Sequence, residues 1–267
     1  MELFYDKKTG YDKLDKTACM DYAEGYKAFL DEGKTERDAV EAIVRMAEAK
    51  GYKAFVRGME VKPGDKFYQV NRYKGVILAH IGRASLADGV RLTAAHLDAP
   101  RIDIRTVPLY EQDGMAYFKT HYYGGIKKYH WLAIPLELRG VVCVCQDGKV
   151  KRVPVHVGNK PGDPKFVITD LLPHLAADQM GKKATEVIKA ENMNVLLGSF
   201  PSENTKDGDK DRVKQAILEY LNAEYGMTEA DFLSAELSCV PAFNACDIGF
   251  DRSLIGVYGH DDRVCSY

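Results

Sequence analysis

The spacing of hydrophobic residues predicts two helices near the start of the chain. Hydrophobic residues recur at helical spacing across residues 15–33, and the segment ends on a glycine. Residues 35–52 begin with Thr35, and Asp38 stands three positions later, which is the spacing of a capping box. Both segments are amphipathic, so we expect two helices that pack against a sheet.

Strand-like segments follow these helices. Residues 65–83 hold two β-rich runs around NRYKG, which indicates a hairpin, and residues 91–100, RLTAAHLDAP, predict a short strand that ends in charged residues. Helices beside strands favour an α/β layer architecture. After Pro100, β-rich runs separated by EQDG, YGG and QDGK predict a mostly antiparallel module inserted into that layer.

The second half of the chain predicts short elements. We expect helices at residues 168–180, 181–193 and 211–226, a strand at 194–200, and short strands after Ala235. The predicted organisation has three parts. They are residues 1–99 as the first part of an α/β domain, 100–242 as an inserted β-rich domain, and 243–267 as a return to the first domain.

Composition and charge narrow the possible functions. The 267 residues are 46% hydrophobic and 28% charged, with a net charge of -2 and a pI near 6.4. This is typical of a globular protein with a core, and it argues against nucleic acid or an anionic membrane as the main partner. Without a signal-peptide pattern or a long apolar run, we expect a cytoplasmic protein whose six cysteines are reduced.

Two short motifs carry candidate chemistry. In HLDAP, His96 and Asp98 are two residues apart at a predicted strand end, so the carboxylate can orient the imidazole while its other nitrogen binds a metal. The commoner alternative is a capped strand end. In GHDDRV, Asp261 or Asp262 can bridge two metal ions, although helix capping is the commoner use of such acids.

Five motifs, taken together and in order, resemble the aspartyl aminopeptidase and aminopeptidase I family of zinc metallopeptidases. The resemblance extends over essentially the whole chain and is closest to the bacterial aminopeptidase I-like branch. The motifs are TAAHLDAP, YYGGIKKYHW, ITDLLPHLAADQ, YGMTEADFLSAEL and GFDRSLIGVYGHDDRVCSY.

The resemblance implies a zinc-exopeptidase-like α/β/α catalytic layer with an inserted β-rich oligomerisation domain. It also implies a peptide substrate, a homo-oligomer and two zinc ions. It makes His96 a zinc ligand, Asp98 the catalytic-site acid that orients it, and Asp261 the bridging ligand. If the alignment with the family motif shifts by one residue, Asp262 becomes the bridging ligand in place of Asp261. His174 falls where the family has a histidine-bearing segment that reaches a neighbouring subunit's active site, although a locally satisfied histidine fits equally well.

The sequence departs from the family in two respects. The family's Glu-Glu pair, a further acidic ligand and the last histidine would all lie beyond Tyr267. We therefore expect an N-terminal portion that is inactive alone, because a catalytic zinc needs about three protein ligands. Ala133 and Pro135 stand where aspartyl aminopeptidases carry acids, so a preference for acidic substrates is not predicted.

Two further hypotheses stay open. The chain could be a non-catalytic interaction subunit that assembles with full-length aminopeptidase chains. It could also be an incomplete product without a function of its own. The hydrophobic stretch around IGFDRSLIGVY predicts an exposed apolar surface and therefore an aggregation-prone or oligomeric chain.

Overall fold

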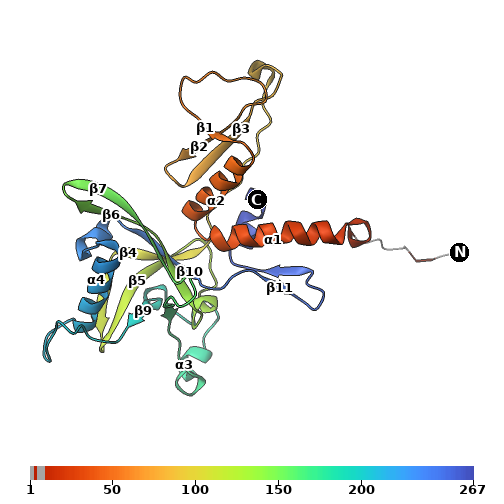
Figure 1. The fold of residues 1–267 in the computed structure, drawn as a ribbon. Helices are drawn as coiled ribbons and strands as arrows, with labels where there is room; N and C mark the ends of the chain where they lie inside the picture. Colours follow the sequence, from red (N-terminus) through yellow and green to blue (C-terminus); the bar gives the residue numbers. More distant parts are fainter. Residues whose placement is uncertain (1–2, 5–9) are drawn as a thin grey trace. The chain divides into compact units, whose positions relative to one another are not determined.

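The chain forms two compact units. The computed structural model describes residues 3–4 and 10–267. Unit 1 contains the described residues up to Asp98 together with Asn244–Tyr267, and unit 2 is Ala99–Phe243. The architecture is mixed α/β, as the sequence predicts (Figure 1). The catalytic and oligomerisation roles expected for the two parts stay predictions.

Two capped helices open unit 1, and both confirm the sequence pattern. Helix α1 (Lys16–Glu32) is capped by Asp15, whose carboxylate accepts hydrogen bonds from the first helical amides. Helix α2 (Glu36–Ala49) is capped by Thr35, whose hydroxyl accepts from the Asp38 amide. These side chains satisfy amides that have no partner within the helix.

The predicted hairpin of unit 1 is confirmed. Strands β2 (Lys66–Asn71) and β3 (Gly75–His80) pair antiparallel, and β1 (Lys53–Ala54) adds a short parallel edge to β2. The turn places Arg72 and Tyr73 at φ of 50° and 61°. Two consecutive positive φ values match the right-handed twist of a hairpin.

The strand predicted within residues 91–100 is wrong. Residues 89–100 form no regular element, and Leu92 is 84% exposed. A strand exists only where a neighbouring strand satisfies its backbone groups, and none of the described strands pairs with this segment. The local residue pattern is typical of a strand, but it does not show whether a neighbouring strand is present.

The return segment of unit 1 packs against α1. It forms β11 (Cys246–Ile248), β12 (Leu254–Gly256) and the short helix α5 (His260–Arg263). Tyr267 then lies against Tyr22, Tyr26 and Phe29 of α1, with ring centroids 5.2, 5.2 and 5.4 Å away. Segments from both ends of the chain therefore share one hydrophobic cluster with Leu30 of α1 and with α2.

Unit 2 is built on a seven-stranded sheet, which confirms the predicted β-rich module. The strand order is β7-β6-β10-β4-β5-β9-β8, and all the pairings are antiparallel. The strands are β4 (Arg101–Gln112), β5 (Met115–Tyr123), β6 (Leu136–Gln146), β7 (Lys149–Val157), β8 (Val167–Ile168), β9 (Val195–Gly198) and β10 (Glu236–Pro241).

One helix covers part of this sheet. Helix α4 (Arg212–Tyr225) packs on β4, β5 and β9, as Figure 1 shows. Its N-cap residue gives no side-chain hydrogen bond, and Glu111 of β4 instead accepts from the Val213 and Lys214 amides at 2.7 and 3.0 Å. A strand residue thus caps the helix and ties it to the sheet.

The predicted helix at residues 181–193 is wrong. Only α3 (Ala177–Met180) and short 3₁₀ turns form between β8 and β9. The segment is largely exposed, and a short helix without a buried face is marginal in water. The described 3₁₀ helices are Gly10–Lys13, Leu86–Asp88, Lys128–Trp131, Pro173–Leu175, Ala190–Asn192, Glu229–Ser234 and Val264–Ser266.

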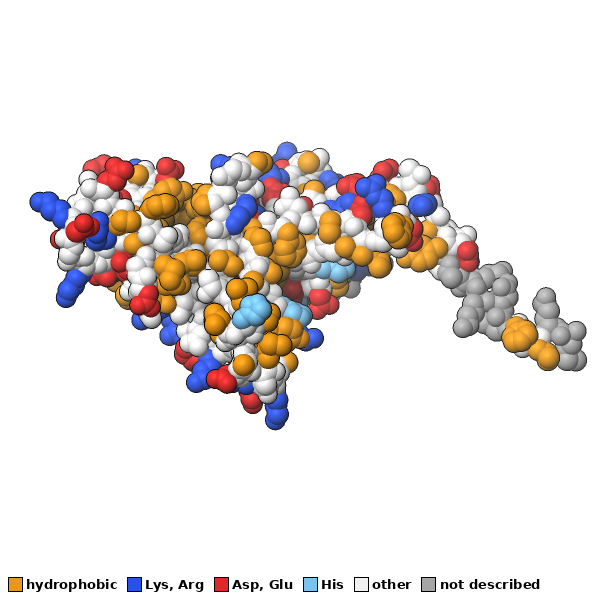
Figure 2. All heavy atoms as spheres, turned by 90° about the horizontal axis from the view of Figure 1, so that it is seen from below, with side chains coloured by type: hydrophobic (Ala, Val, Ile, Leu, Met, Phe, Trp, Pro, Cys, Tyr) orange, Lys and Arg blue, Asp and Glu red, His pale blue; other side chains and the backbone are white. Residues whose placement is uncertain are grey.

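Hydrophobic side chains are frequent on the molecular surface. Figure 2 shows them among charged residues on the face drawn. Ile248 and Leu254 are 45% and 59% exposed, and Phe250 between them is fully exposed. Within the described part of the chain, no helix has the length and apolar character needed to cross a membrane.

Candidate functional site

His96 and Asp98 lie in the irregular segment that ends the first part of unit 1. The imidazole Nδ1 of His96 is 3.0 Å from the Asp98 carbonyl oxygen and 3.3 Å from its carboxylate oxygen Oδ1. Both partners are hydrogen-bond acceptors, so Nδ1 carries the ring proton and donates a hydrogen bond to them. The Nε2 lone pair is then free to bind a metal, and the His96 side chain is 61% exposed.

Asp262 of α5 lies close enough to His96 for their charges to interact. Partial burial raises the pKa of Asp262, while Arg263 and then His96 lower it and Asp261 raises it. The return segment therefore brings one carboxylate within electrostatic range of the imidazole. Asp261 precedes Asp262 in the same short helix, but its side chain is exposed and makes no described hydrogen bond or ion pair.

The donors that come together fit zinc in type but not in number. An imidazole nitrogen and a carboxylate oxygen are common zinc ligands, and a catalytic zinc usually has three from protein. Within residues 3–4 and 10–267, no group of three or more His, Cys, Asp or Glu side chains could hold a metal ion. We therefore derive no catalytic step through a metal from these residues alone.

Three residues that support this region received no role from the sequence motifs. The Tyr26 hydroxyl of α1 lies 2.9 Å from Nδ1 of His260 and donates to the His260 carbonyl at 3.3 Å. Tyr267 packs on the same face of α1. Arg263 is fully buried and donates to backbone carbonyls on two loops. A sequence shows that an arginine is present but not that it is buried.

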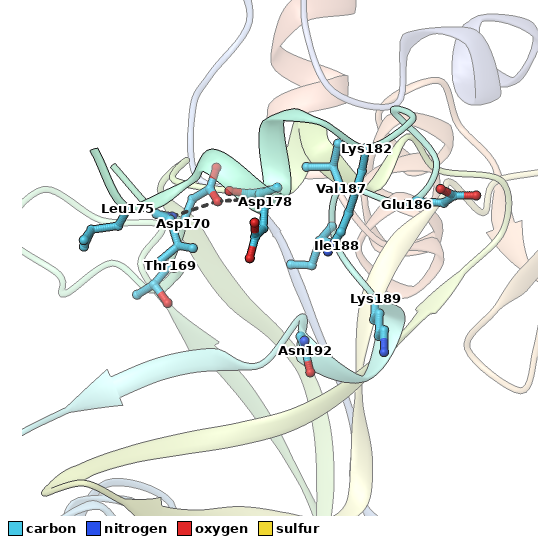
Figure 3. A pocket seen from close by; sticks show the side chains of 12 residues that line it. Thr169, Asp170, Leu175, Asp178, Lys182, Glu186, Val187, Ile188, Lys189 and Asn192 are labelled. Carbon is cyan, nitrogen blue, oxygen red and sulfur yellow. Dashed lines mark hydrogen bonds between the residues drawn. The ribbon is translucent and has the colours of Figure 1, made fainter. Parts of the chain in front are cut away.

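His174 lies in unit 2 on the 3₁₀ turn Pro173–Leu175, and it is exposed. The same region contains a cavity of about 540 Å³ (Figure 3). Asp170 and Gln179 line this cavity and are joined by a hydrogen bond of 2.8 Å between the Gln179 Nε2 and Asp170 Oδ1 atoms. His174 is not one of its lining residues, so the cavity does not explain the proposed role of this histidine.

Comparison with known proteins decides the family. Residues 29–267 match the family described as aminopeptidase I zinc metalloprotease (M18). The chain belongs to this family. The match confirms the resemblance carried by the five motifs, and the family is one of zinc-dependent enzymes.

Bacterial M18 members are similar to the chain along its whole length. A probable M18 family aminopeptidase 1 from Clostridium acetobutylicum is 44% identical over 274 residues, which are 100% of this chain and 58% of that protein. The crystal structure of the Thermotoga maritima M18 aminopeptidase has a TM-score of 0.90 at 40% identity, with 99% of this chain and 57% of that chain covered.

A second M18 crystal structure agrees with the first. The C. acetobutylicum aminopeptidase I structure has a TM-score of 0.84 at 40% identity, with 99% of this chain and 59% of that chain covered. These solved structures confirm the α/β fold. The chain spans between half and two thirds of the length of each of these M18 relatives, so their whole activity does not transfer to it directly.

Proposed function

We propose that this chain supplies the first part of the zinc centre of an aminopeptidase that removes N-terminal residues from peptides. The observation that carries the proposal is the contact between the two segments of unit 1 that hold the candidate ligands, where Arg263 of the return segment donates to the Leu97 carbonyl between His96 and Asp98 at 2.9 Å. Family membership supports the chemistry, because M18 members are zinc metalloproteases.

The roles proposed for the residues follow from their chemistry. His96 offers Nε2 to a metal, and Asp98 fixes the ring by accepting a hydrogen bond from Nδ1. Either Asp261 or Asp262 would hold the zinc through its carboxylate. The charge interaction with His96 favours Asp262 as a ligand, while the resemblance to the family favours Asp261. When bound, the zinc activates water and polarises the substrate carbonyl.

Zinc binding tests this assignment. Equilibrium dialysis with metal analysis compares the wild-type chain with His96→Ala, and with His80→Ala as a control from an exposed position of unit 1. We expect weak zinc binding that His96→Ala removes and His80→Ala leaves unchanged. Equal binding by all three chains would refute His96 as a ligand.

We further propose that unit 2 mediates assembly and that His174 contacts substrate bound to a neighbouring subunit. One solved structure with this fold, at 16% identity and a TM-score of 0.64, is a dodecamer of S. cerevisiae mApe1. Size-exclusion chromatography with light scattering gives the assembly state of the purified chain. A stable monomer would contradict the assembly role.

The alternative is a non-catalytic subunit that assembles with longer aminopeptidase chains. The small number of potential metal ligands in the described residues supports it. Co-expression with a tagged full-length M18 chain distinguishes the two proposals, because co-purification in fixed proportion is expected only if the chains assemble together.

A further inference from the structure

Arg263 is a charged side chain that is completely removed from solvent. Its exposed fraction is 0%, and it is among the largest fully buried side chains of the described residues. Burying a guanidinium is strongly unfavourable unless its donors find partners. The choice of partners therefore shows what the side chain holds in place.

The partners of Arg263 are backbone atoms on two separate loops of unit 1. Its Nε donates to the Leu97 carbonyl at 2.9 Å, and its Nη2 donates to the Lys34 carbonyl at 2.8 Å. The Tyr258 ring lies 5.5 Å from the guanidinium carbon. One side chain of α5 thus joins the α1–α2 loop to the HLDAP segment.

Leu97 stands between the two residues of the candidate site. Its side chain packs against the hydrophobic cluster formed by α1 and α2, while Arg263 holds its carbonyl. Fixing both parts of Leu97 limits how the neighbouring His96 can turn. Arg263 also directly follows Asp262 along α5, so its bond to the Leu97 carbonyl ties the backbone next to His96 to the helix turn that carries Asp262.

We propose that Arg263 is a positioning residue that holds the HLDAP segment, and with it His96, against α5. It does not contact the metal or the substrate. The zinc part of this inference rests on the proposed function, whereas the arrangement of His96 does not. Nη1 of Arg263 is buried and makes no hydrogen bond to the described residues, so the bonds to the two loop carbonyls come from Nε and Nη2.

The test compares Arg263→Met, which removes both hydrogen bonds, with Arg263→Lys, which keeps the charge. Arg252→Met is the matched control, because Arg252 belongs to the same unit and its side chain is 70% exposed. Chains labelled with ¹⁵N-histidine report the His96 ring nitrogens by NMR, and circular dichroism confirms folding. The resonances of His96 are assigned from their loss in His96→Ala.

The wild type and Arg252→Met should show a single Nδ1-protonated tautomer for His96. Arg263→Met should show the averaged signals of a mobile ring. Added zinc should shift Nε2 in the wild type, and Arg263→Met should raise the midpoint of that titration by about ten-fold. Arg263→Lys should lie between the two, since one ammonium group replaces a two-pronged donor.

Each outcome decides the inference. A folded Arg263→Met chain with wild-type His96 signals and an unchanged zinc midpoint would overturn it. If Arg263→Met does not fold, wild-type signals and midpoint in folded Arg263→Lys would overturn it equally. If the substitutions alter the His96 ring but zinc never perturbs it in the wild type, the positioning role stands and the proposed zinc function fails.

Discussion

Replacing Tyr267 with alanine tests whether the return segment is docked on α1. The ring lies 5.2 to 5.4 Å from three aromatic rings of α1 and is partly buried. Complete burial of an aromatic ring is worth about 3–5 kcal/mol on truncation, and each aromatic pair about 0.5–1.5 kcal/mol. For this partly exposed ring we expect a loss of about 2 kcal/mol in the unfolding free energy of unit 1.

Urea unfolding with two probes measures this loss. Helices α1 and α2 contribute 17 and 14 residues to the circular dichroism signal against 14 from α4, so that signal reports mainly on unit 1. The fluorescence of Trp131 reports on unit 2. With a slope of about 2 kcal/mol per molar urea, the dichroism midpoint should fall by about 1 M.

Phe250→Ala is the control, because this aromatic residue of the same return segment is fully exposed. It should leave both midpoints unchanged, and Tyr267→Ala should leave the Trp131 midpoint unchanged. If Tyr267→Ala moves the dichroism midpoint no more than Phe250→Ala does, Tyr267 does not dock on α1 and the reasoning is wrong.

Three further predictions concern unit 1 and the cysteines. A Cβ on Gly25 would lie 2.5 Å from the Tyr267 hydroxyl oxygen, so Gly25→Ala should lower the melting temperature of the wild type. Gly25→Ala should raise the melting temperature of the Tyr267→Phe variant, because alanine is a better helix former than glycine by about 1 kcal/mol. A higher melting temperature in both backgrounds would contradict the contact between position 25 and the Tyr267 hydroxyl. Burial raises the pKa of the Cys239 thiol, so Ellman's reagent should label it only in urea, and rapid labelling of native Cys239 would refute its burial. The exposed thiols should react in the native chain, and they are Cys19, Cys145, Cys246 and Cys265. The hydrogen bond from Lys27 lowers the pKa of Asp247, so its stabilisation is present above the ordinary aspartate pKa and is lost as the pH falls through the folded value. Lys27→Met should therefore reduce the loss of unfolding free energy as the pH falls through the acidic range. An unchanged dependence on pH in that range would show that the pair of Lys27 and Asp247 does not contribute to stability.

Local patterns were sufficient to predict the elements that local forces decide. The spacing of apolar residues and the caps at Asp15 and Thr35 specify α1 and α2, and the NRYKG turn specifies the β2–β3 hairpin. The segment 91–100 was predicted wrongly because strand formation depends on a partner that the segment does not encode. Residues 181–193 carry helix-forming residues but have no face to bury.

The candidate site could be predicted in part. The motif HLDAP identified His96 and Asp98, and their contact is present. The motif GHDDRV limited the proposed carboxylate ligand to two adjacent residues. Successive residues of a helix point about 100° apart, so the motif alone cannot tell which of the two carboxylates is directed towards His96. Arg263 was missed because its burial follows from the packing of α5 on two loops.

The central proposal is that the described residues hold only part of an aminopeptidase zinc centre. Its most direct test is the hydrolysis of leucyl-p-nitroanilide by the purified 267-residue chain with added zinc. The account predicts no turnover above that of the same chain treated with a chelator. Turnover that requires zinc and that His96→Ala abolishes would contradict it, because the described residues would then form a complete site.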